Sequence, residues 1–124
     1  MSKPESTSQE QLPAWVESSL FKGMLRGIER ETLRMQSDGF LSQESHPKAL
    51  GSALTHPHIT TDYSEALMEF ITPPKASIQE TLDYLTDIHT VAHQHLENEE
   101  KLWPLSMPCM LDDADDSIRL AQYG

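Results

Sequence analysis

Two glutamates alternate with other side chains in residues 27–34, which read GIERETLR. In an extended strand, successive side chains point to opposite faces, so Glu29 and Glu31 would project from the same face. Their backbone positions would lie roughly 6 to 7 Å apart, because that is the span of two strand rises. Like charges at this spacing repel each other unless a cation lies between them. The pair therefore indicates a site for hard divalent cations, with a solvated acidic face as the alternative.

A second stretch, residues 61–72, reads TDYSEALMEFIT and also embeds acids among apolar residues. Glu69 lies between Met68 and Phe70, where an unpaired carboxylate is costly if it is buried. Two apolar-rich segments that each carry embedded acids favour one shared acidic site.

The net charge argues against one class of partner. The chain has 124 residues, which is enough for one modest domain. Its 20 acidic and 9 basic residues leave a net charge of -11. Nucleic-acid binding needs clustered Lys and Arg, so we expect no nucleic-acid partner. Cations, or anions that arrive together with a divalent metal, fit this charge better.

The cellular location is predicted from what the sequence does not contain. No segment approaches the roughly 20 apolar residues that cross a bilayer, so we expect no membrane partner. Residues 1–10 are polar, lack the apolar core of a signal peptide and read as a disordered tail before a domain over residues 11–124. Cys109 is the only cysteine, which excludes an internal disulfide and suits a small apolar role. Together these features predict a cytoplasmic protein.

The pattern of apolar, turn and capping residues predicts an α+β chain. Each element is bounded by a local signal such as Gly23, the Ser-Asp-Gly turn at 37–39, or the capping box of Ser77 and Glu80. The expected elements are a short helix from Pro13 to about Lys22, a strand from 27 to the turn at 37–39, a loop over 40–61 with one helical turn at 48–54, a strand over 65–72, a helix from Ser77 to about Lys101 and an extended segment over 103–110.

Several histidines and acids are better explained by packing or by solvent exposure than by metal binding. In the predicted helix, His89 and His93 have the spacing of metal ligands, but His89 lies within the apolar arc and is better explained as a packed histidine. Residues 97–100 read as a solvated acidic face. The loop histidines lack the spacing of a zinc site and read as solvated, and residues 112–116 lack the Gly and Glu of a calcium loop and read as an exposed turn. The apolar arc comprises Ile78, Leu82, Leu85, Ala92 and Leu96, and the loop histidines are His46, His56 and His58.

Five short motifs in a fixed order together resemble the N-terminal part of glutamate-cysteine ligases of the proteobacterial type. They are GIERETLR at 27–34, LGSALTH at 50–56, ITTDY at 59–63, EFITP at 69–73 and WPLSMP at 103–108. The resemblance runs from about Trp15 to Gly124. It implies that the chain is the N-terminal portion of a protein several times longer, so that the remainder of the ligase is missing.

The resemblance implies a glutamine-synthetase-like α+β fold, in which an antiparallel sheet cups the active site. The family joins the γ-carboxylate of L-glutamate to the amine of L-cysteine at the expense of ATP, through a γ-glutamyl phosphate, in the first step of glutathione biosynthesis. Glu29, Glu31, Asp62 and Glu69 match the family positions that hold Mg²⁺, for which Mn²⁺ is an alternative ion. Tyr63 matches an aromatic position near the cysteine side chain. No catalytic residue is assigned within these residues.

The reaction explains why acids are needed at these positions. ATP and the substrate carboxylates are negative, and Mg²⁺ lets them approach an acidic cup by bridging phosphate oxygens. The chain contains no glycine-rich phosphate loop or nucleotide-binding lysine, so we expect adenine and acceptor contacts in downstream sequence. A non-catalytic acidic module or remnant that binds divalent metal is the competing hypothesis. We expect the isolated chain to be inactive and to expose open sheet edges.

Overall fold

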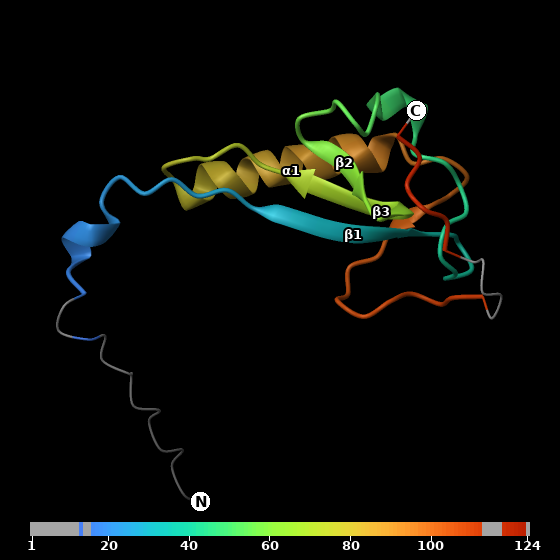
Figure 1. Ribbon diagram of the computed structural model, residues 1–124, viewed down its shortest axis with the longest axis horizontal. Coiled ribbons are helices and arrows are strands. Elements are labelled where there is room, and N and C mark those ends of the chain that lie inside the picture. Colours follow the sequence, from blue (N-terminus) through green and yellow to red (C-terminus); the bar gives the residue numbers. More distant parts are fainter. Residues whose placement is uncertain (1–12, 14–15, 113–117, 124) are drawn as a thin grey trace, which may run out of the picture.

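An antiparallel sheet of four strands carries one long helix on one face in the computed structural model (Figure 1). The structure describes residues 13, 16–112 and 118–123. The sheet order is β2-β3-β1-β4. The strands are β1 (Glu29–Met35), β2 (Ile59–Asp62), β3 (Ser64–Ile71) and β4 (Lys101–Leu102), the helix is α1 (Ile78–Gln94), and two 3₁₀ turns are η1 (Ser18–Phe21) and η2 (Lys48–Leu50). This arrangement confirms the α+β prediction.

The alternation of side chains in β1 and β3 separates a core face from an open face. Met68 and Phe70 of β3 are fully buried, and they pair with Thr32 and Arg30 of β1. α1 packs on this core face, where the His89 ring meets the Phe70 ring edge-to-face at 4.5 Å between centroids. The packed-histidine interpretation of His89 is therefore confirmed.

β2 is a strand inside the stretch that the sequence analysis read as a loop. Ile59 is buried and pairs with Phe70, and β2 continues antiparallel to β3 as far as Asp62. The loop prediction for residues 59–61 is wrong, because four residues give too short a pattern to reveal a strand that is stabilised by pairing with β3. η2 confirms a helical turn, although it is a 3₁₀ turn that ends at Leu50.

α1 begins as predicted but ends earlier. The Ser77 hydroxyl accepts the Glu80 N–H at 3.4 Å, which caps the first turn. The helix ends at Gln94, not near Lys101, because the backbone reverses through positive φ angles at Asn98 and Glu99 and then pairs with β1 as β4.

The buried face of α1 is also rotated from the predicted arc. Thr81, Ile88 and Ala92 are buried, whereas Ile78 and Leu82 are 62% and 44% exposed. The predicted core role of Ile78 and Leu82 is therefore wrong. The sheet contacts one stripe of the helix, and the apolar positions of the helix extend beyond that stripe.

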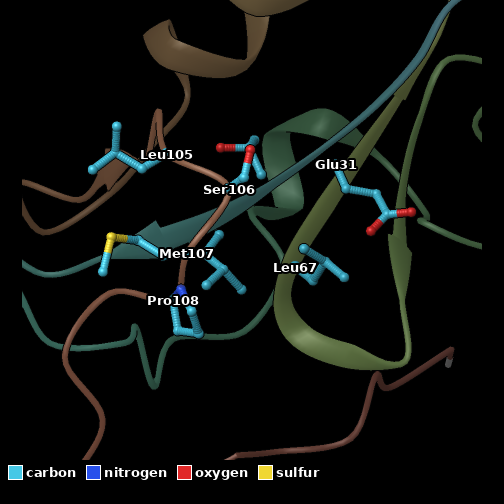
Figure 2. A pocket seen from close by; sticks show the side chains of 8 residues that line it. Glu31, Leu67, Leu105, Ser106, Met107 and Pro108 are labelled. Atoms are coloured by element: carbon cyan, nitrogen blue, oxygen red, sulfur yellow. The ribbon is translucent and has the colours of Figure 1, made fainter.

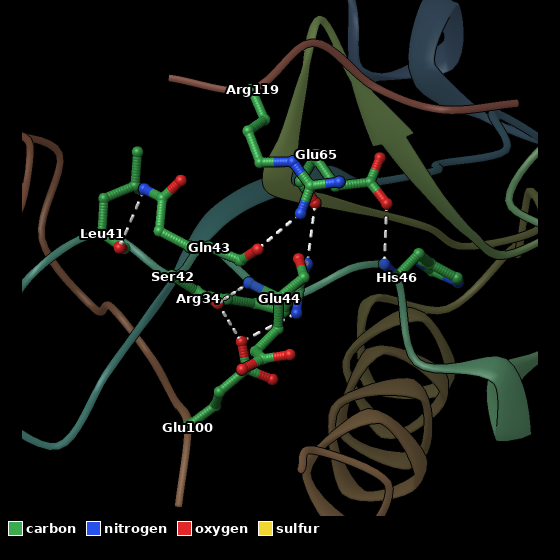
Figure 3. A network of polar contacts seen from close by, with 9 residues as sticks. All are labelled: Arg34, Leu41, Ser42, Gln43, Glu44, His46, Glu65, Glu100 and Arg119. Carbon is green, nitrogen blue, oxygen red and sulfur yellow. Dashed lines mark hydrogen bonds and ion pairs between the residues drawn. The ribbon is translucent and has the colours of Figure 1, made fainter. Parts of the chain in front are cut away.

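A buried ion pair joins β1 to the segment before β4 (Figure 3). The fully buried Arg34 guanidinium donates to Glu100 Oε1 at 2.7 Å, and its other terminal nitrogen donates to the Glu44 and Glu65 carbonyls. Ser42 Oγ also donates to Glu100 Oε1. Glu100 is therefore buried, and the prediction that residues 97–100 form a solvated face is wrong at this position.

Two loop histidines make hydrogen bonds within the fold, so the prediction that they are solvated is wrong. His56 Nδ1 accepts the N–H groups of His58 and Ile59, at 3.1 and 2.8 Å. The His58 ring nitrogens lie 2.9 Å from the Ile71 carbonyl and 2.8 Å from the Tyr84 hydroxyl. Because Tyr84 belongs to α1, His58 bridges the helix to the start of β2.

Near the N-terminus, the predicted helix is reduced to η1 in the described residues, and it ends before Gly23, as expected. Gly23 has φ +76°, a conformation that favours glycine. Cys109 is buried beside Leu41 and Ala66, which confirms its apolar role. The predicted tail over 1–10 and most of the predicted turn over 112–116 lie outside the described residues.

The histidines predict acid sensitivity of the fold. Burial lowers the pKa of His46, His56 and His89 below the ordinary value of 6.5. The Arg34 guanidinium lowers the pKa of His46 further. The unfolded chain therefore binds more protons than the folded chain as the pH falls below about 6.5, and the free energy of unfolding should decrease there.

Urea unfolding between pH 5 and pH 8 measures this effect. Both ring nitrogens of His46 are buried and have no hydrogen-bond partner within the described part of the chain. His46→Gln should therefore flatten the pH dependence, whereas His93→Gln, at an exposed helix position, should leave it unchanged. Equal slopes for wild type and His46→Gln would contradict the assignment.

Candidate functional site

Four carboxylates from three strands lie on the open face of the sheet. Glu31 of β1 is the direct cross-strand partner of Glu69 of β3, and Glu29 lies two residues earlier on the same face of β1. Glu69 also pairs with Thr60 of β2, and Asp62 lies two residues after Thr60. The strand pairing therefore brings Glu29, Glu31 and Glu69 together, and Asp62, which follows a register shift after Thr61, lies close enough to influence Glu69. We call Glu29, Glu31, Asp62 and Glu69 the acidic quartet.

The electrostatics of Glu69 show that the other three carboxylates lie close enough to influence it. Burial raises the pKa of the Glu69 carboxyl above its ordinary value, and the charges of Glu29, Asp62 and Glu31 raise it further. Glu69 is half-buried, whereas Glu29 and Glu31 are exposed. The open face therefore concentrates negative charge with no described cation opposite it to compensate Glu69. Such a face attracts cations, and a bound cation would lower the pKa of Glu69.

The donor chemistry of the quartet fits Mg²⁺. Mg²⁺ prefers oxygen ligands and is commonly held by one or two carboxylates together with waters and substrate phosphates. No three or more His, Cys, Asp or Glu side chains within residues 13, 16–112 and 118–123 are grouped closely enough to hold an ion by themselves. The quartet is thus a shared acidic face that can supply part of a coordination shell, not a closed cage.

Two pockets flank the quartet. One, of about 370 Å³, lies beside Glu31 and is walled by Leu67 and by Leu105, Met107 and Pro108 of the loop before Cys109 (Figure 2). The other, of about 440 Å³, lies beside Glu29, with Ile71 and Pro74 among its lining residues. Each pocket places apolar walls next to a carboxylate, as small-ligand sites often do.

The loop over residues 103–108, which the sequence predicts to be extended and which carries the WPLSMP motif, was not predicted to line this site. The Thr32 hydroxyl donates to the Trp103 carbonyl at 2.7 Å, and the Trp103 ring N–H donates to the Met107 carbonyl at 2.6 Å. These bonds fix the loop beside β1. The closely spaced Trp and two Pro residues were the only sequence signal for a rigid loop.

Tyr63 lies at the tight turn between β2 and β3, next to Asp62. Its φ of +56° is left-handed, and its side chain is 82% exposed. The Tyr63 carbonyl accepts the Ala121 N–H at 2.9 Å, which holds the backbone while the ring remains free. A non-glycine residue in this conformation is uncommon, and such strain is often kept where a side chain must be presented.

A membrane-crossing helix is absent from the part of the chain that the structure describes, because no helix there combines the necessary length and apolar character.

The sequence comparisons match this chain to one family. The sequence model of the glutamate-cysteine ligase family matches residues 10–124. A glutamate-cysteine ligase from Photorhabdus laumondii is 53% identical over 113 residues, which are 90% of this chain and 21% of that protein.

Two solved structures have the same fold. A glutamate-cysteine ligase from Francisella tularensis in complex with AMP matches with a TM-score of 0.75 and 40% identity, over 81% of this chain and 20% of that one. A bifunctional glutathione synthetase from Pasteurella multocida matches with a TM-score of 0.78 and 39% identity, over 84% of this chain and 14% of that one. The chain thus spans about a fifth or less of these relatives. With a family match over nearly its whole length, this chain belongs to the glutamate-cysteine ligase family.

Proposed function

We propose that this chain supplies the acidic face of an ATP-dependent glutamate-cysteine ligase, which forms γ-glutamylcysteine from L-glutamate and L-cysteine in the cytoplasm. The observation that carries the proposal is the strand register that sets Glu31 directly opposite Glu69, where the neighbouring carboxylates also raise the pKa of Glu69. Like charges directly opposite each other on neighbouring strands destabilise a sheet, so a solvated surface without a function does not explain this arrangement.

The role of the quartet follows from its charge. The quartet would hold Mg²⁺, which would supply positive charge to offset the negative charge of ATP during phosphoryl transfer. Glu31 and Glu69 would hold it from opposite strands, and Glu29 and Asp62 would extend the face on either side. Because the backbone of a paired sheet is rigid, these carboxylates can keep the positions of the ions fixed.

The flanking features suggest where the substrates lie. The pocket beside Glu29 places the apolar side chains of Ile71 and Pro74 next to a carboxylate, so it could take part of a small substrate. Tyr63 presents an exposed ring next to Asp62, where it could contact the cysteine side chain. The remaining contacts to ATP, glutamate and cysteine would come from the part of the enzyme that corresponds to the other four fifths of the relatives.

The alternative, a non-catalytic acidic module that binds divalent metal, has no observation in its favour. It requires the same quartet, but it does not explain the neighbouring pockets. Mg²⁺ binding alone does not distinguish the two functions, so the deciding measurement is turnover.

A chimera tests the proposal. We expect the isolated 124-residue chain to release no phosphate with glutamate, cysteine, ATP and Mg²⁺. Joined in one polypeptide to the remainder of the Photorhabdus relative, in place of its matching 113 residues, it should restore turnover to within about tenfold of the parent enzyme. A folded chimera without activity would contradict the proposed function, as would full activity of the isolated chain.

A further inference from the structure

The outer edge of β1 is uncovered along its first half. Residues 101–102 of β4 pair only with residues 34–35, and the Trp103 N–H donates to the Leu33 carbonyl at 2.8 Å. Nothing in the described residues continues this pairing toward the start of β1. The first half of β1 is therefore an open strand edge beside the acidic quartet.

The backbone groups of Glu29 and Glu31 point toward this open edge. In an antiparallel strand, the N–H and C=O of one residue point the same way, and those of its neighbours point the opposite way. The Thr72 N–H donates to the Ile28 carbonyl at 3.0 Å, so residue 28 faces β3 and residues 29 and 31 face outward. Across the described ranges, no main-chain partner reaches them from outside. Unpaired edge groups of this kind accept an added strand.

An exposed apolar segment directly precedes this edge. Leu20, Phe21, Met24 and Leu25 are between 46% and 61% exposed. Figure 1 shows η1 standing away from the sheet, and the backbone hydrogen bonds of Leu20 and Lys22 are local to it. Four large apolar side chains within six residues form a surface that ordinarily marks an interaction site. We call residues 20–25 the apolar segment.

The comparisons indicate what covers both features. The chain corresponds to 21% of the Photorhabdus ligase and 20% of the Francisella ligase, so about four fifths of each of those enzymes have no counterpart in it. We infer that the open edge of β1 and the apolar segment form a docking surface for the remaining part of a glutamate-cysteine ligase, even when that part is a separate polypeptide. A strand of the remainder pairs with β1, and apolar side chains of the remainder bury the apolar segment.

Charge argues against a second copy of this chain as the occupant. Pairing two copies through this edge would bring Glu29 and Glu31 of both copies into one continuous sheet face. Like charges placed opposite each other on neighbouring strands are destabilising, and each copy carries a net charge of -11. The inference rests on the proposed function only for the identity of the partner.

Association in trans is the test. The tagged 124-residue chain is produced together with a Photorhabdus ligase that lacks the matching 113 residues, and both co-purification and the dissociation constant are measured. Glu29→Pro removes an outward N–H without removing a bond to β3, while Glu29→Ala keeps that N–H and removes only the carboxylate. The double variant Phe21→Asp/Leu25→Asp probes the apolar segment. Leu54→Asp is its control, because Leu54 is 65% exposed in the loop before β2, at the opposite edge of the sheet.

We expect a one-to-one complex that Glu29→Pro and the double variant each weaken at least about tenfold, with Glu29→Ala and Leu54→Asp binding like wild type. Circular dichroism checks folding, and the double variant decides the matter if Glu29→Pro misfolds. Absence of a complex, or a homodimer that Glu29→Pro disrupts, would overturn the inference. A complex without ligase activity would support the docking surface and count against the proposed function. An active covalent chimera whose two parts do not associate as separate chains would support the proposed function and count against the docking surface.

Discussion

Replacing Glu31 or Glu69 by glutamine should lower kcat/KM of the covalent chimera about 10²- to 10³-fold, because each change removes a carboxylate from the proposed Mg²⁺ shell. The same changes should stabilise the metal-free fold at pH 7. Glu31 and Glu69 are direct cross-strand partners, and relieving like charges at such a pair contributes about 0.2 to 1 kcal/mol. Loss of activity together with a gain in stability distinguishes a charged functional site from a structural one.

The pH dependence gives this prediction a second readout. A glutamate whose pKa is raised by folding stabilises the fold when it is protonated, below its ordinary value of 4.5, and loses that contribution as the pH rises through its folded pKa. The stability gained by Glu69→Gln should therefore be largest near neutral pH and vanish toward pH 4. Urea unfolding at several pH values measures it.

Mg²⁺ should also stabilise the fold, because a bound cation would offset the same repulsion between carboxylates. On the proposed function, Mg²⁺ binds the folded wild-type chain and raises its Tm, whereas Glu31→Gln should reduce that shift. Glu80→Gln is the control, because Glu80 is an exposed acid in the first turn of α1, outside the quartet. Variants that lose stability but retain full activity would show that the quartet is structural.

The second large effect is expected at the buried ion pair. Arg34→Met should destabilise the chain by about 3 to 5 kcal/mol, because it leaves the Glu100 carboxylate buried without its counter-charge. It also removes the donors to the Glu44 and Glu65 carbonyls, so the loop over 42–46 and the start of β3 would each lose a hydrogen bond to β1. A loss of this size is comparable to the whole stability of a small domain.

Unfolding followed by Trp103 fluorescence measures this loss, since Trp103 lies directly after β4. Adding Glu100→Gln to Arg34→Met should recover part of the stability, because the unpaired charge is then removed. Arg119→Met is the matched control, because it removes a guanidinium that donates to the Gln43 carbonyl at the exposed side of the same network (Figure 3), and its cost should stay below about 1 kcal/mol. Equal losses for the two arginines would show that burial of the pair is unimportant.

Much of the local structure could be predicted from residue order alone. Alternation placed Glu29 and Glu31 on one face, the turn at 37–39 closed β1, and Ser77 with Glu80 fixed the start of α1. Each of these signals acts between residues that are close in the sequence, so the chain needs no distant partner to express them. The sequence by itself therefore determined the elements that carry the acidic residues and, through the family resemblance, the reaction class to test.

The tertiary structure decided the features that depend on distant partners. β2 exists because β3 pairs with it, which places residues 59–61 in a strand where the sequence predicts a loop. Glu100 is buried because Arg34, far away in the sequence, supplies its counter-charge, and α1 ends early because the chain must turn to bring β4 beside β1. The register that places Glu31 opposite Glu69 also arises only on pairing. Alternation within one strand fixes which face a side chain occupies, but it cannot specify which residue of another strand lies opposite.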